Sequence, residues 1–324
     1  MGQGLYFNPG DGGPVMEITA GLRCPTMSAQ WNTSDWQQMS TTISNVVPGS
    51  TMFIVPRVAA VYRPAFSPDL IPTIFMLDGY TISGNTVTQQ LWRSKNNDNN
   101  YKAFDASLWQ ILPATQSGNT GLLIQDSTDW TAIPSATMAG FCVWRGSITV
   151  SGEALLPDTG YPQSQQVVFA DWSAPGVTIE CDGTRIYAYR DRLNYYDDPA
   201  TVTLTLAIFA SGIPPVPGPG LTIMNAANEC VFSLTKRPFV FTGAMWTPGM
   251  SPVDIGPTMV PLGTFGFDSD IASGWDILKL LGIIRNGNVI QLGRGKVKAR
   301  WTDKYPVTGR RIASLTLPLI PKMY

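Results

Sequence analysis

Apolar and polar residues alternate with period two along several stretches of the chain, which places them on opposite faces of β-strands. The alternation is clearest over residues 80–87, 201–208 and 289–299. Turn-forming residues recur between such stretches at intervals of about 8–12 positions, a spacing typical of β-sandwiches. We therefore expect an all-β fold with few short helices.

Three Asp-Gly or Asn-Gly pairs lie between β-favouring runs and predict tight hairpins, because type I′ turns need positive φ at both central residues. Successive pairs are 104 residues apart, while a fourth pair, Asp11-Gly12, lies outside this register. The regular spacing indicates an internal repeat. The three registered pairs are Asp78-Gly79, Asp182-Gly183 and Asn286-Gly287.

Two further features recur in step with these pairs. A Gly-Leu dipeptide opens an apolar strand at Gly4, Gly121 and Gly220, and an aliphatic strand that runs into prolines closes each unit. Polar or Gly/Pro-rich segments at 114–120 and 211–219 separate the units. We expect three tandem β-sandwich-like domains of immunoglobulin type, at residues 1–117, 118–217 and 218–324.

One stretch, 269–281, has helical periodicity. Ser269 or Asp270 is a suitable N-cap, and apolar residues follow Ile271 at spacings of four and three. The alternative for this stretch is a loop that leads into the third hairpin. Elsewhere, the run of Asn and Asp at 96–100 predicts an exposed loop tip.

The composition agrees with a turn-rich β protein and excludes several kinds of chemistry. The 324 residues include 31 Gly and 26 Pro, too many for a long helical bundle, while 44% apolar residues suffice for a buried core. The chain contains no histidine, which excludes a Ser-His-Asp triad, a His general base and a His-ligated metal. Its four cysteines include no close pair and are expected to be buried free thiols.

Motifs for catalysis, metal binding or targeting are weak. The Ser-x-x-Lys string at 233–236 lies in a strand-like run without its partner motifs, and the Asp-Ser-Asp run at 268–270 is only a fragment of a calcium loop. Asp197-Asp198 precedes a proline and predicts a turn. We expect no enzymatic activity, no cofactor, no secretory signal and no membrane span.

Charge is divided unevenly along the chain. Residues 279–324 contain ten basic residues and one acidic residue, a net charge of +9, whereas the rest of the chain carries −10. Within this segment four basic residues alternate and share one face of a strand. This basic ladder is either a solvated face or a contact surface for an acidic partner, for the chain's own N-terminal part or, less favoured, for nucleic acid. It consists of Arg294, Lys296, Lys298 and Arg300.

Aromatic residues form the second candidate contact group. Trp31 and Trp36 lie in a Ser/Thr/Gln-rich segment, and Tyr187 and Tyr189 share a strand face among arginines. Tyr, Trp and Arg are the residues that most often anchor protein interfaces. The alternatives are a sandwich core with an amphipathic rim and a platform for sugar stacking.

The opening MGQGLYFNP, followed by MEITAGLRC at 16–24, resembles the start of small tail-associated proteins of lambda-like, long-tailed bacteriophages. The Gly-Leu-x-Ile-x-Asn string at 220–225 is similar to related tail proteins. The resemblance covers mainly the first 25 residues and the repeated openings, and it brings no catalytic residues. It implies a structural part of the virion that is synthesised in the host cytoplasm and assembles with other tail-tip or fibre proteins.

Two other function classes remain open. The chain is alternatively a tail protein that binds a host receptor or carbohydrate through exposed aromatic residues. An enzyme such as a depolymerase would need two convergent carboxylates, which a sequence alone does not place.

Overall fold

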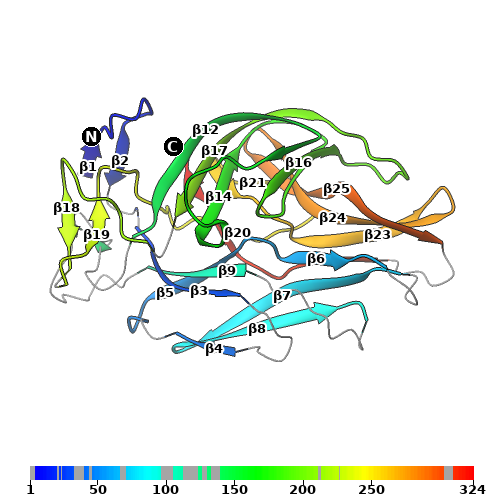
Figure 1. Ribbon diagram of the computed structural model, residues 1–324, viewed down its shortest axis with the longest axis horizontal. Coiled ribbons are helices and arrows are strands. Elements are labelled where there is room, and N and C mark those ends of the chain that lie inside the picture. Colours follow the sequence, from blue (N-terminus) through cyan, green and yellow to red (C-terminus); the bar gives the residue numbers. More distant parts are fainter. Residues whose placement is uncertain are drawn as a thin grey trace.

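The computed structural model describes residues 4–19, 22, 24–32, 40–43, 46–65, 71–95, 105–111, 123–125, 130–132, 139–210, 213–225, 227–302 and 309–324. Within these ranges the regular structure consists of β-strands and one short 3-10 turn, η1 (Gln163–Gln165). The predicted all-β class is confirmed. In Figure 1 one large sheet forms the upper layer and two smaller sheets lie beneath it, a sandwich-like arrangement.

The large sheet has thirteen strands and forms the upper layer of the molecule (Figure 1). Eleven strands follow the order β21-β25-β24-β15-β16-β13-β12-β17-β14-β22-β28. Outside this order, β23 pairs with β24, and β26 pairs with β23. The paired strands are antiparallel, so short turns suffice to connect sequence neighbours. The strands are β12 (Phe141–Ser151), β13 (Glu153–Leu155), β14 (Gln166–Asp171), β15 (Val177–Cys181), β16 (Arg185–Arg190), β17 (Thr201–Ala210), β21 (Val253–Asp254), β22 (Thr258–Pro261), β23 (Gly266–Ala272), β24 (Trp275–Asn286), β25 (Val289–Thr302), β26 (Gly309–Ile312) and β28 (Ile320–Pro321).

The lower layer is built from the N-terminal part of the chain (Figure 1). One sheet has the order β3-β9-β5 and the other β4-β8-β7-β6. Their strands are β3 (Thr26–Asn32), β4 (Ser40–Thr42), β5 (Thr51–Pro56), β6 (Ala60–Arg63), β7 (Thr73–Ser83), β8 (Thr86–Arg93) and β9 (Asp105–Ile111).

Four short strand pairs complete the fold, and three of them lie at or directly after the repeated Gly-Leu dipeptides in the sequence. The first of these pairs contains its dipeptide, and the other two begin directly after theirs, so a short antiparallel strand pair recurs at each opening. Outside this series, β20 (Met245–Trp246) pairs with β27 (Leu317–Pro318). The three opening pairs are β1 (Gly4–Phe7) with β2 (Met16–Thr19), β10 (Leu123–Gln125) with β11 (Trp130–Ala132), and β18 (Thr222–Met224) with β19 (Cys230–Ser233).

The hydrophobic core does not divide at the predicted boundaries 117/118 and 217/218. The main core cluster joins Leu77, Ile208 and Leu281, one from each predicted unit, all fully buried. In a second cluster, Trp109 and Phe209 pack against Phe239, and their ring centroids lie 4.8 and 5.0 Å from that of Phe239. Strands on both sides of 217/218 also pair directly in the large sheet, so the three repeats share one interior instead of closing three separate ones.

Two of the three predicted hairpin pairs form hairpins. Asp182-Gly183 connects β15 to β16, and Asn286-Gly287 connects β24 to β25. The prediction for Asp78-Gly79 is wrong, because this pair lies inside β7 at a β-bulge and the turn falls at Gly84 instead. The Asp78 carboxylate accepts hydrogen bonds from Arg311 at 2.6 and 3.0 Å, and the Asp78 carbonyl accepts one from the Ser314 amide. At the bulge, Asp78 therefore binds the C-terminal segment through both its side chain and its carbonyl group.

The predicted helix at 269–281 is also wrong. The segment forms β23 and the start of β24, joined by a tight turn in which Ser273 and Gly274 have φ of 54° and 77°. The interior of β24 is buried on both faces, so its apolar residues run almost continuously and mimic a helical stripe. Three other sequence features, Trp36, the loop 96–100 and the linker 114–120, lie outside the described residues.

Candidate functional site

The basic ladder lies on β25 and faces β15 and β16 of the same chain. Arg294 contacts Asp268 at 2.8 Å and Lys298 contacts Glu180 at 2.7 Å. Lys296 contacts Glu153 at 3.4 Å, and Arg300 donates from Nε to a backbone carbonyl, that of Tyr195, at 2.8 Å. All four ladder residues thus have partners inside the chain.

Tyr187 and Tyr189 lie on β16 opposite the ladder. The Lys298 ammonium is 4.4 Å from the centroid of the Tyr187 ring, and the Lys296 ammonium is 5.4 and 5.8 Å from the two tyrosine rings. These distances are within the range of cation–π attraction. The Tyr187 hydroxyl donates to the Asp182 carboxylate at 2.8 Å; burial, the larger cause, and this hydrogen bond raise the pKa of Tyr187. The structure therefore brings together six of the eight predicted contact residues.

Glu180 is the buried centre of this cluster. Its Oε1 accepts a hydrogen bond from the Lys296 amide at 2.8 Å, and its Oε2 contacts Lys298. Burial raises the pKa of Glu180, while the Lys298 charge opposes that shift. A Cβ on Gly295 would overlap the Glu180 carboxylate, so only glycine leaves room for it. The cluster is a packed ion-pair network without an open cavity among the described pockets.

Four further basic residues of the C-terminal segment follow the same pattern. The sequence left open whether the +9 segment meets an acidic partner, its own chain or nucleic acid. In the structure the acidic part of the same chain supplies the counter-charges. The further pairs are Arg285 with Asp171 at 2.9 Å, Arg310 with Asp268 at 2.7 Å, Arg311 with Asp78 at 2.6 Å and Lys322 with Asp171 at 2.9 Å.

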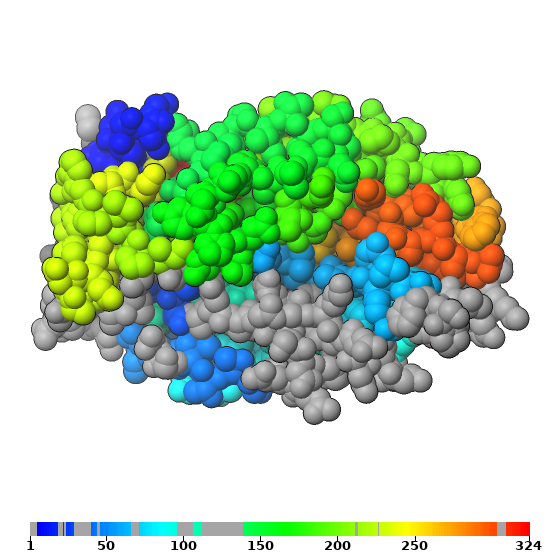
Figure 2. Space-filling model, viewed as in Figure 1, coloured from blue at the N-terminus to red at the C-terminus, as the bar shows by residue number. Residues whose placement is uncertain are grey.

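Beside the ladder, three aromatic side chains form a surface that we call the aromatic shelf, which consists of Tyr195, Tyr196 and Trp275. Tyr196 is 73% exposed, Trp275 is 38% exposed and Tyr195 is half-buried. Ile271, 45% exposed, lies on the other face of the β23–β24 hairpin, because it pairs with Asp276 whereas Trp275 pairs with Ala272. The Tyr195 ring is 4.9 Å from Tyr196 and 5.9 Å from Trp275, and the Arg300 guanidinium lies 5.0 Å from its centroid. In Figure 2 the light-green loop after β16 and the orange β23–β24 turn meet at the right end of the molecule.

Sequence reasoning identified only part of this shelf. The two tyrosines belong to a cluster of Tyr and Arg residues in the sequence, but Trp275 falls on the apolar face of the helix that was wrongly predicted at 269–281. The signal that identifies Trp275 is the Ser273-Gly274 turn, which requires positive φ at both positions and therefore favours a hairpin tip. Residues at a hairpin tip are commonly exposed.

The two predicted tryptophans do not join the shelf or the ladder. Trp31 lies in β3 and pairs through its backbone with Ala106 of β9, in the lower layer. Trp36 lies outside the described residues.

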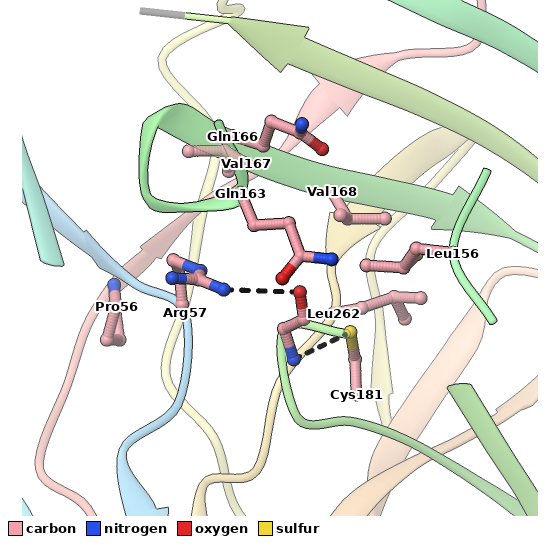
Figure 3. Close-up of a pocket in the computed structure, with 10 residues that line it drawn as sticks. Pro56, Arg57, Leu156, Gln163, Gln166, Val167, Val168, Cys181 and Leu262 are labelled. Carbon is pink, nitrogen blue, oxygen red and sulfur yellow. Dashed lines mark hydrogen bonds between the residues drawn. The ribbon is translucent and has the colours of Figure 1, made fainter. Parts of the chain in front are cut away.

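A narrow pocket between the layers contains a buried cysteine (Figure 3). The Arg57 Nη2 donates to the Gly183 carbonyl at 3.2 Å, and the Gly183 amide donates to the Cys181 Sγ at 3.4 Å. Burial raises the pKa of the Cys181 thiol to about 12, so the thiolate required for nucleophilic attack is scarce. The cavity has a volume of about 10 Å³, room for about one water molecule. This pocket is too small for a substrate.

Searches for two further kinds of site gave negative results. Within the described ranges, no group of three or more Cys, Asp or Glu side chains is arranged to hold a metal ion. In the same part of the chain, no helix is long and apolar enough to cross a membrane.

Comparison with known proteins places the chain in a family. Residues 4–303 match the model of a family of unknown function, DUF6453. The chain belongs to this family. No curated protein and no solved structure matches it. The match to DUF6453 extends across all three predicted units, from β1 to the end of β25, so the basic ladder and the aromatic shelf lie within the family region. The shared interior lies mostly within it, with further core residues contributed by 313–324.

Proposed function

We propose that this DUF6453 protein is a structural component of the virion of a long-tailed bacteriophage. In this proposal it assembles with other tail-tip or tail-fibre proteins through the aromatic shelf. The resemblance of residues 1–24 and 220–225 to phage tail proteins supports the biological setting. The observation that carries the proposed mode of action is the exposure of Tyr196 and Trp275 on the shelf.

The shelf is suited to binding because it differs from the ladder beside it. The ladder cations are held by Asp268, Glu153, Glu180 and the Tyr195 carbonyl, so a partner would have to break existing contacts to engage them. Tyr196 and Trp275 remain exposed, and burying their apolar area would favour association by about 25 cal/mol per Å². Large, rigid aromatic side chains next to an arginine are typical anchors of protein interfaces.

The test is incorporation of the protein into phage particles. We expect the chain in purified virions, and we expect the double variant Tyr196→Ala/Trp275→Ala to be incorporated about tenfold less, because two interface anchors are lost. Leu155→Ala is the matched control, since Leu155 is 64% exposed and lies on β13, outside the shelf. Absence of the chain from purified virions, or equal incorporation of all three proteins, would overturn the proposal.

The alternative is a tail protein that binds a receptor or carbohydrate on the host surface. Tyr196 supports it, because a 73% exposed ring presents a face for stacking on a sugar. Reproducible binding on a glycan array that free sugar competes away and Tyr196→Ala abolishes would favour this alternative. Binding to phage tail proteins alone would favour the structural role.

A further inference from the structure

A second polar site lies at the opposite end of the molecule from the aromatic shelf. A cavity of about 380 Å³ opens between the start of β12, the segment 235–237 after β19 and the loop of the β1–β2 hairpin. In Figure 1 these elements meet at the left end, and in Figure 2 the blue N-terminal hairpin lies beside the green and yellow surfaces there. Its lining includes Trp144, Arg145, Lys236 and Arg237.

The cavity already holds one carboxylate, that of Asp11. Arg237 is 1% exposed and donates to both Asp11 oxygens, from Nε at 2.8 Å and from Nη2 at 2.7 Å. Arg145 adds a contact to the same carboxylate at 3.3 Å. A Cβ on Gly13 would overlap both guanidinium groups, so the Asp11-Gly12-Gly13 loop is shaped to lie directly against them. This arrangement shows that the site accepts an oxyanion.

Asp11 does not use all the donors of the cavity. All three nitrogens of Arg237 are already engaged, because its Nη1 donates to the Met323 carbonyl at 2.9 Å in addition to the two bonds to Asp11. Arg145 Nη1 and the exposed Lys236 ammonium have no acceptor among the described residues. Asp11 is also the single acidic residue in the lining, against three cations, so the cavity keeps an excess of two positive charges. Such an excess favours a second, external anion.

The shape of the cavity indicates the size of that anion. A volume of about 380 Å³ is at the lower end of the range for small-molecule sites, roughly 300–1,000 Å³, and suits a compact ligand better than an extended peptide. Trp144 and Val143 give the lining an apolar part, and an indole next to cations suits a ring that carries a charged substituent. We propose that this cavity binds a monosaccharide-sized ligand bearing a phosphate or carboxylate group, held by Arg145 and Lys236.

The proposal goes beyond the proposed function, since the cavity lies away from the shelf and involves none of its residues. Titration calorimetry of the full chain with glucose 6-phosphate tests it, with glucose and inorganic phosphate as separate titrants. We expect saturable binding of glucose 6-phosphate, no binding of glucose and weaker binding of inorganic phosphate. Raising the salt concentration should weaken the binding, because exposed charges are screened.

Two variants locate the site. Lys236→Ala removes an exposed side chain without a partner among the described residues, so folding is preserved, and we expect about tenfold weaker binding from the loss of one charge-assisted contact. Arg185→Ala, which removes an exposed cation on β16, should leave binding unchanged. Absence of glucose 6-phosphate binding, or binding unaffected by Lys236→Ala, would overturn the site. Equal affinity for inorganic phosphate and glucose 6-phosphate would overturn the ligand class and indicate a simple anion site.

Discussion

At the scale of single residues, Asp11 joins the N-terminal hairpin to the body of the molecule. Its carboxylate faces the buried Arg237, the partly exposed Arg145 and the exposed Lys236, and its hydrogen bond with Arg237 is the main reason that its pKa lies far below the ordinary value near 3.8. The loop also carries an Asx turn, in which the Gly13 amide donates to Asp11 at 3.1 Å. An unpaired Arg237 would leave a charge with almost no access to water.

We therefore predict that Asp11→Asn lowers the free energy of unfolding at neutral pH by about 2 kcal/mol. This is below the roughly 3–5 kcal/mol for breaking a fully buried pair, because Asp11 is 37% exposed and water screens part of the interaction. A depressed folded-state pKa stabilises the protein above the ordinary pKa, and this contribution is lost as the pH falls below it. The difference between the two proteins should therefore stay constant above about pH 5 and shrink as the pH is lowered from about 5 to about 2.

Chemical denaturation at several pH values measures this difference, and Asp158→Asn is the matched control. Asp158 makes the same kind of turn, with the Gly160 amide donating at 2.9 Å, but no arginine among the described residues pairs with it. A constant difference across the pH range, or an equal cost in the control, would contradict the assignment.

The residue patterns of the contact groups were only partly readable from the sequence. Period-two alternation correctly placed the four ladder cations on one face, because strand geometry is local. It did not reveal that Glu180 on β15 and Glu153 on β13 lie opposite them, since contact between β25 and these strands depends on how distant strands are arranged. The Asp11–Arg237 pair joins residues 226 positions apart, and no local pattern predicts such a contact.

At the scale of elements, glycines decide how closely β24 and β25 approach β15, with Gly282 on β24 and Gly295 on β25. Gly295 leaves the space that the Glu180 carboxylate occupies, and a Cβ on Gly282 would overlap the Ile179 carbonyl. Neither glycine has a positive φ, so their role is close approach and not turn formation. The close packing of these strands therefore requires glycine at both positions, because any side chain there would overlap a neighbouring group.

We predict that Gly295→Ala lowers the free energy of unfolding by at least about 3 kcal/mol, because it displaces a buried, paired carboxylate. Gly249→Ala is the control, since the nearest atom to its added Cβ is 4.0 Å away. In a Glu180→Ala background the cost of Gly295→Ala should fall sharply, because the overlapping group is gone. Equal costs with and without Glu180, measured by urea denaturation, would contradict the packing argument.

The elements themselves were predicted where local turn chemistry dominates. The hairpins at Asp182-Gly183 and Asn286-Gly287 form, with Gly183 and Gly287 at the positive φ that the turns require. At Asp78-Gly79 the strand continues, because the Asp78 side chain and carbonyl are engaged by Arg311 and Ser314. The incorrect helix at 269–281 has a different cause, since a strand buried on both faces loses the alternation that distinguishes it from a helix.

At the scale of the whole molecule, the repeat in the sequence and the organisation of the core are separate properties. The Gly-Leu openings recur as three short strand pairs, so the repeat has a structural counterpart. The interior does not follow the repeat, because Leu77, Ile208 and Leu281 lie in one cluster. A composition-based linker marks a change in local sequence, whereas a domain boundary requires that few contacts cross it.

This shared interior predicts how the molecule unfolds. Because each predicted unit contributes buried residues to one core, no unit can lose its structure without exposing apolar surface on the others. We therefore expect a single cooperative transition in urea, with the same midpoint by far-UV circular dichroism and by tryptophan fluorescence. For the same reason, fragments cut at 117/118 or 217/218 should lack stable tertiary structure on their own. Three independent sandwich domains would instead give separate transitions in the full chain, and each fragment would unfold cooperatively on its own. Separate transitions, or a cooperatively unfolding fragment, would show that the shared core does not couple the units.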